Sequence, residues 1–89
     1  MAQASNKPVK VFRLRGISAS IFEKHAKRDG REVTFHNVSI QRTYKDGDEF
    51  KSTASLGRDD LPVAQLLMRR SWEFILDTEA ASRKDTSEE

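Results

Sequence analysis

The sequence has 89 residues, a length that accommodates one small domain and excludes a second. Hydrophobic residues make up 36% and charged residues 34%, and the net charge is only +2, a balance typical of folded rather than disordered chains. Cysteine is absent, which excludes disulfides, thiolate nucleophiles and cysteine-ligated metals and favours a cytoplasmic location. No apolar run approaches the roughly 18 residues of a membrane span, so we expect no membrane association.

The first half of the chain has the alternation of β-strands. Alternating apolar residues predict strands over about 9–15 and 17–25, with Gly16 at a tight bend between them. Asp29-Gly30 favours a hairpin turn, and a long third strand follows from Val33 to Tyr44. Its apolar residues change parity midway, which predicts a bulge or bend near His36-Asn37 and therefore a curved sheet.

A second turn and a change of period follow the third strand. Asp46-Gly47 predicts another hairpin turn, and the alternation of residues 50–56 predicts a fourth strand. After Gly57, Asp59 or Asp60 can cap a helix whose first turn contains Pro62, and helical spacing continues to about residue 78. The predicted fold is α+β: a curved four-stranded antiparallel meander followed by one C-terminal helix.

The predicted helix is apolar over more than half of its circumference. A single sheet face does not need so wide a stripe, so we expect the protein to be a homodimer. The predicted dimer interface comprises Leu66, Trp72, Phe74 and Ile75. The predicted domain spans 9–79, and residues 1–8 and 80–89, which lack apolar periodicity, are expected to be disordered tails, the second one acidic.

Charge is distributed unevenly along the sequence. Residues 1–58 carry a net charge of +6, whereas residues 59–89 carry −4. The strand region therefore presents a positive field of the kind that attracts polyanions.

The two faces of the predicted sheet differ in composition. The helix is expected to cover Ile17, Ala19, Ile21, Val38, Ile40, Ala54 and Leu56. The opposite face then carries Ser18, Ser20, Phe22, Lys24, Ser39, Gln41, Thr43, Lys51, Thr53 and Ser55. Phe12 is predicted to join this second face, as is Phe35 if the parity switches. Aromatic, basic and small polar side chains on one face suit single-stranded nucleic acid, because they stack on bases and bind phosphates.

Three segments carry a resemblance to known proteins. They are Ile17–Glu23, Phe35–Asp46, and Ser55–Pro62 leading to Ser71–Ile75, and they resemble a group of small, largely uncharacterised prokaryotic proteins. The predicted β-β-β-β-α architecture is similar to the single-stranded-DNA-binding domains of positive-cofactor-four transcription coactivators, Whirly proteins and Pur-alpha repeats. This resemblance implies a helix-mediated dimer that binds single strands on the exposed sheet face.

We therefore expect a non-enzymatic protein that binds single-stranded DNA, or RNA, with low sequence specificity and without a cofactor. Phe12 and Phe22 are the predicted stacking residues, and Gln41 is a predicted polar contact. The predicted phosphate-binding residues are Lys10, Arg13, Arg15, Lys24, Lys27, Arg28, Arg31, Arg42, Lys45 and Lys51. The alternatives are a protein–protein interaction module, or subunit of a larger complex, and a structural module whose basic strands are simply solvated.

The remaining candidate residues have simpler interpretations. His25 and His36 could form a zinc site only if Glu23, Glu32 or Asp29 completed it, so they are expected to be surface or bend histidines, and we predict no metal. Asp59-Asp60 is expected to cap the helix rather than to catalyse. Arg69 and Arg70 are expected to pair within the helix, with a phosphate contact as the alternative, and Trp72 is assigned to packing rather than to stacking on bases.

Overall fold

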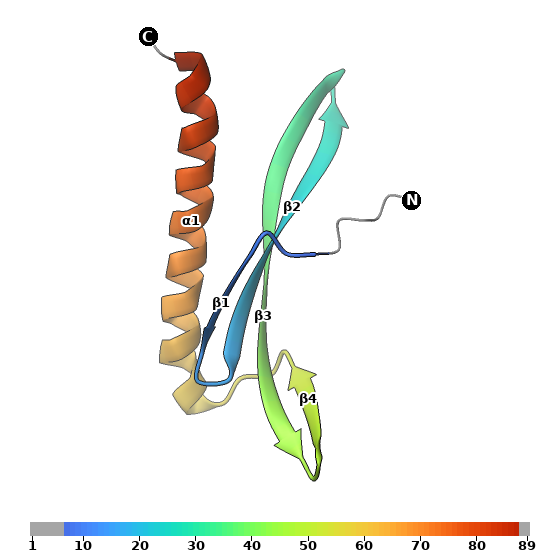
Figure 1. Cartoon of the computed structure of the whole chain (residues 1–89), viewed down its shortest axis with the longest axis vertical. Helices are drawn as coiled ribbons and strands as arrows, with labels where there is room; N and C mark the ends of the chain where they lie inside the picture. Colours follow the sequence, from blue (N-terminus) through green and yellow to red (C-terminus); the bar gives the residue numbers. More distant parts are fainter. Residues whose placement is uncertain (1–6, 88–89) are drawn as a thin grey trace.

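The structure is a computed structural model that describes residues 7–87. The elements are β1 (Lys10–Leu14), β2 (Ile17–Arg28), β3 (Arg31–Asp46), β4 (Glu49–Thr53), the short 3-10 helix η2 (Arg58–Asp60) and α1 (Leu61–Ser87). The four strands form one antiparallel sheet in the order β1-β2-β3-β4, and α1 follows them (Figure 1). The predicted α+β meander with a C-terminal helix is thus confirmed.

Tight turns connect the strands. Arg15 and Gly16 have φ angles of 52° and 80°, and Asp29 and Gly30 have 54° and 80°. Positive φ at both central residues defines the turn whose twist matches that of the flanking strands, and glycine adopts this conformation at no steric cost. The Asp29-Gly30 turn is therefore formed as predicted.

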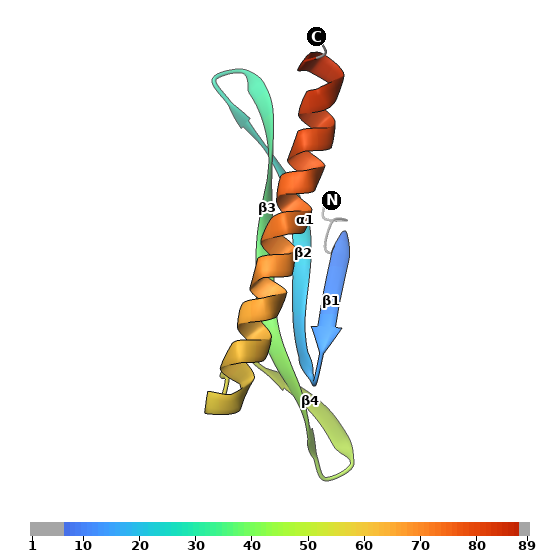
Figure 2. The same ribbon diagram turned by 90° about the vertical axis from the view of Figure 1, so that its left-hand side faces the viewer.

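The core lies between α1 and one face of the sheet. In it, Ile17 and Ala19 of β2 pack against Ala64 and Leu67 of α1. Figure 2 shows α1 running over this face, roughly along the strands. The small side chains Ala19 and Ala64 let the helix lie close to the strands. Ser71 is also buried, and its hydroxyl donates to the Leu67 carbonyl oxygen at 2.8 Å, which satisfies the polar group inside the core.

The β2–β3 pairing contains no bulge. Its register continues residue by residue from Ile17↔Arg42 to Arg28↔Arg31, so of the bulge or bend predicted near His36-Asn37, the bulge is absent. Side chains alternate strictly along an unbroken strand. Val33 and Phe35 therefore lie on the face opposite to Val38 and Ile40. Both side chains are exposed there.

Several element boundaries differ from the prediction: β2 and β3 are longer than expected, and β4 and α1 end elsewhere. Strand β4 ends at Thr53, so Ala54 and Leu56 lie beyond it, although Leu56 still packs against the core. Helix α1 continues to Ser87, beyond the predicted end near residue 78, and so extends into the segment 80–87 that was expected to be part of a tail. The reason is local: neither glycine nor proline follows Pro62, and Glu79, Ala80 and Ala81 favour helix. The other predicted tail residues, 1–6 and 88–89, lie outside the described part.

Asp60 connects the sheet to the start of the helix. Its carboxylate accepts a hydrogen bond from the Gly57 N–H at 2.8 Å, and Arg42 Nε of β3 lies 3.3 Å from the same oxygen, Oδ2. Asp60 thus caps the 3-10 turn that leads into α1, where a capping role at the start of the helix was predicted. Together these contacts fix the direction in which the chain leaves the sheet.

The molecule is elongated. Its principal extents are 54 × 32 × 18 Å, and its radius of gyration is 16.2 Å, whereas a compact domain of this length has a radius of about 12 Å. The β2–β3 and β3–β4 hairpins project in opposite directions past the core (Figure 1). Within residues 7–87, α1 lacks the apolar stretch that a membrane-crossing helix requires.

Candidate nucleic-acid interface

The strand register sorts the paired residues into two faces. Cross-strand partners share a face, and the buried residues Ile17, Ala19 and Ile21 identify the one beneath α1, which we call the helix-side face. The other, which we call the outer face, consists of Val11, Arg13, Ser18, Ser20, Phe22, Lys24, Ala26, Arg28, Arg31, Val33, Phe35, Asn37, Ser39, Gln41, Thr43, Lys45, Phe50 and Ser52.

The acidic side chains of the paired strands are confined to one of these faces. Among the paired strand residues, the basic side chains of the outer face are Arg13, Lys24, Arg28, Arg31 and Lys45, and none of its members is acidic. The acidic residues of the paired strands, Glu23, Glu32, Asp46 and Glu49, all belong to the helix-side face. The outer face therefore presents a positive field that no carboxylate on the same face of the strands offsets.

Aromatic rings lie among these cations. Phe50 is 73% exposed and Phe35 is 45% exposed, while Phe22 is partly buried. Lys24 Nζ lies 6.0 Å from the centroid of the Phe22 ring, and Lys45 Nζ lies 5.8 Å from that of Phe50. A ring beside an ammonium group provides a stacking surface for a base together with a charge for its phosphate.

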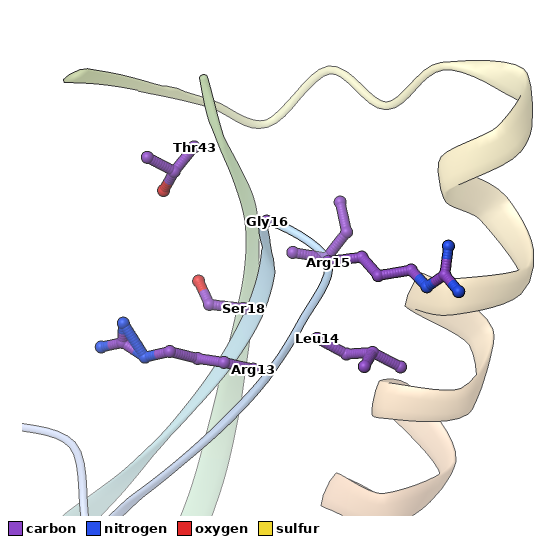
Figure 3. A pocket seen from close by; sticks show the side chains of 7 residues that line it. Arg13, Leu14, Arg15, Gly16, Ser18 and Thr43 are labelled. Carbon is purple, nitrogen blue, oxygen red and sulfur yellow. The ribbon is translucent and has the colours of Figure 1, made fainter. Parts of the chain in front are cut away.

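A shallow pocket lies at the β1–β2 end of the outer face. Figure 3 shows Arg13, Ser18 and Thr43 pointing to one side, and Leu14 and Arg15 pointing to the other side, toward α1. The pocket holds its shape because the Thr43 N–H donates to the Gly16 carbonyl oxygen at 2.9 Å across the turn. A guanidinium beside two hydroxyls suits a phosphate oxygen, since all three groups can donate hydrogen bonds to it.

The register corrects the predicted position of Phe12. This residue pairs with Ala19 and therefore belongs to the helix-side face. Its ring meets that of Phe74 edge-on, with the ring centroids 6.4 Å apart. Phe12 is thus part of the packing between β1 and α1, and its predicted place on the outer face is wrong. Lys10, whose Nζ lies 5.2 Å from the Phe12 ring centroid, shares this face.

Three more predicted phosphate-binding residues lie on the helix-side face. Lys27 is the cross-strand partner of Glu32, Arg42 is paired with Asp60, and Lys51 Nζ lies 3.2 Å from Asp46 Oδ2. The expected outer-face positions of Lys51 and Thr53 are wrong, because the β3–β4 turn pairs Lys51 with Tyr44. That register cannot be derived from the alternation within the fourth strand alone.

Seven of the other predicted contacts lie on the outer face: Arg13, Phe22, Lys24, Arg28, Arg31, Gln41 and Lys45. Arg15 occupies the β1–β2 turn, and its side chain points away from that face, toward α1 (Figure 3). The sequence prediction omitted Phe50 from the stacking residues. The available signal was the short turn after Asp46, since it pairs Phe50 with Lys45 and so places the ring among the outer-face cations.

The histidines form a small polar cluster on the helix-side face. Glu23 has its Oε2 3.8 Å from His36 Nε2 and its Oε1 3.9 Å from His25 Nε2, and His25 Nδ1 lies 3.1 Å from Thr34 Oγ1. Within the described chain, no group of three or more His, Cys, Asp or Glu side chains is placed to hold a metal ion.

The predicted dimer-interface residues divide into two groups. Trp72 is 60% exposed and Leu66 is also exposed, whereas Phe74 and Ile75 are half-buried against the sheet side of the molecule. Arg69 pairs with Glu73 at 3.2 Å, as expected for residues one turn apart. Trp72 is therefore not part of the core of the single chain.

Comparisons with known proteins identify no relative. No protein-family model matches the chain, and neither the search of curated proteins nor the search of solved structures finds a match. The resemblance to single-stranded-DNA-binding domains therefore stays a prediction.

Proposed function

We propose that the protein binds single-stranded nucleic acid along the outer face of its sheet, with single-stranded DNA favoured and RNA possible. One observation carries this proposal: the outer face of the paired strands holds five basic residues and three phenylalanines, and its described residues include no acidic side chain. The strands' carboxylates lie on the opposite face, as an anion-binding surface requires.

The arrangement supports binding by two kinds of contact. Arg13, Lys24 and Lys45 are spaced along the sheet and can each bind a backbone phosphate, while Phe22, Phe35 and Phe50 offer faces on which bases stack. The serine, threonine, asparagine and glutamine side chains between them can hydrogen-bond to sugars or bases. Because rings and cations recognise every base and phosphate alike, sequence specificity is low.

The aromatic side chains favour a single strand over a duplex. A phenylalanine ring can stack on a base only where the face of that base is free, and base stacking in a duplex covers these faces. A duplex meets the outer face through its phosphates alone. We therefore expect single strands to bind more tightly than duplexes of the same length.

Fluorescence anisotropy of a labelled mixed-sequence 20-nucleotide strand tests the proposal. We expect binding to weaken steeply between low and physiological salt, because binding releases counterions from the phosphates. We expect an unlabelled duplex to compete poorly with the labelled single strand. Absence of binding at low salt would refute the proposal. Binding that duplex displaces as well as single strand does would refute the role of base stacking.

A further inference from the structure

An apolar groove runs along α1 beside β3, on the helix-side face of the molecule. It is lined by Val38, Ile40, Met68, Trp72 and Ile75. Met68 is 49% exposed, and Trp72 is the most exposed residue of the groove. An indole ring left in water forgoes the burial of a large apolar surface, so contiguous exposure of this kind marks an interaction site.

The groove continues as a stripe along α1. Leu61, Met68, Trp72 and Leu76 are all exposed, and their spacing places them on one side of the helix. The part of the stripe next to Trp72 is symmetric about it: an apolar residue lies four positions before it and four after it, Met68 and Leu76. Seven positions before and after it lie polar residues, Gln65 and Glu79.

The molecule exposes more surface than a compact monomer of its mass. A folded chain of 10.2 kDa exposes about 5,300 Å², whereas this chain exposes 7006 Å². The surplus, about 1,700 Å², exceeds the ~800 Å² that each partner contributes to an ordinary stable interface. The projecting hairpins and the exposed side of α1 both contribute to this surplus (Figure 1).

We propose that a second copy of this chain occupies the groove, with the two α1 helices antiparallel about a two-fold axis through Trp72. Trp72 then meets its counterpart, and Met68 of each copy packs against Leu76 of the other. The Gln65 side-chain amide of each copy donates a hydrogen bond to the Glu79 carboxylate of the other. Each contact away from the axis occurs twice, as in any two-fold interface, and the symmetry of the stripe around Trp72 fits a second copy better than an unrelated chain.

This arrangement refines the interface predicted from the sequence. Trp72 and Ile75 belong to the groove, whereas Leu66 lies outside the stripe and Phe74 contacts Phe12 within the same chain. The interface is also separate from the outer face, which lies on the other side of the sheet. Dimer formation and nucleic-acid binding can therefore be tested independently.

Light scattering and sedimentation give the first test. We expect the wild-type protein to have twice its chain mass at micromolar concentration, and Trp72→Glu to raise the dimer dissociation constant at least about 100-fold. Leu66→Glu is the matched control, because it adds the same charge to the same helix outside the stripe, and it should remain dimeric. A monomeric wild type would overturn the proposal, as would equal effects of the two variants.

The wild-type protein also offers a test that requires no substitution. Trp72 is its only tryptophan, so its emission reports this site alone. On dilution we expect the emission to shift to the red with the same midpoint as the fall in mass. A change in mass without a change in emission would place the dimer contact elsewhere.

Cross-linking tests the antiparallel register. The chain has no native cysteine, so Met68→Cys and Leu76→Cys each introduce a single thiol. Under oxidation, a mixture of the two variants should form disulfide dimers faster than either variant alone, because the two-fold axis brings residue 68 of one copy to residue 76 of the other. Faster cross-linking of each variant with itself would indicate parallel helices and contradict the proposal.

Discussion

Phe50 and Phe35 are large apolar side chains that the fold holds in water. Neither contributes much to the core, because Phe50 lies on the projecting β3–β4 hairpin and Phe35 on the outer face of the β2–β3 hairpin. Each has a cation as its cross-strand partner, Lys45 and Lys24 respectively. At the scale of the residue, these pairs are the units from which the proposed binding surface is built.

Replacing Phe50 by alanine should weaken the binding of single strands. Loss of one stacked base costs about 1–3 kcal/mol, which corresponds to roughly 5- to 150-fold in the dissociation constant measured by anisotropy. Tyr44→Ala is the control, because Tyr44 is an exposed aromatic residue of the adjacent strand on the opposite face. If both variants bound like the wild type, Phe50 would have no role in stacking.

At the scale of the element, strand alternation decides on which face each charged side chain lies. Along the β2–β3 hairpin, each two-residue step returns the chain to the same face, so a basic residue and an acidic neighbour in the sequence end on opposite sides. Glu23 and Lys24 show this directly: Glu23 lies with the histidines on the helix-side face, and Lys24 lies on the outer face.

Two triple substitutions with the same change in net charge test this separation. Replacing Arg13, Lys24 and Lys45 by alanine removes three outer-face cations, whereas replacing Lys10, Lys27 and Lys51 removes three from the helix-side face. We expect the first variant to lower the salt dependence, the slope of log K against log salt concentration, by about 2, since each phosphate contact contributes ~0.7. The second should leave the slope close to that of the wild type.

Equal losses in the two variants would have a different meaning. They would show that total charge rather than the outer face determines binding. Circular dichroism should show both variants folded, because all the substituted side chains except Lys24 are exposed and Lys24 is only partly buried.

At the scale of the whole molecule, the core of a single chain is small. The buried hydrophobic residues in the described chain are Ile17, Ala19, Ile21, Ala64 and Leu67, and two of these are alanines. A domain with so little buried apolar surface has limited stability by itself. An interface that covers the apolar groove would add to this stability and make it depend on protein concentration.

Leu67→Ala should lower the free energy of unfolding by about 2–4 kcal/mol, because it removes a side chain that is 2% exposed and leaves a cavity between α1 and the sheet. Leu66→Ala changes the neighbouring, exposed leucine and should cost less than about 1 kcal/mol. Urea denaturation at one fixed protein concentration compares them. Similar losses for both leucines would contradict the packing described here.

The sequence by itself determined the order of the elements, the Asp29-Gly30 turn and the excess of basic residues in the strands. These follow from local properties: alternation, turn chemistry and composition. It also placed Ser18, Phe22 and Gln41 on the outer face correctly, because they lie on long strands that alternate without interruption.

Only the tertiary structure decided the facing of the short edge strands. Strand β1 is five residues long, and its register with β2 places Phe12 against Ala19 and Phe74 rather than on the outer face. The β3–β4 register likewise placed Lys51 on the helix-side face and Phe50 on the outer face. A residue's face depends on the partner strand, and a change of register by one residue moves every side chain to the other side. For the same reason, the confinement of the strands' acidic residues to the helix-side face appears only once the strands are paired.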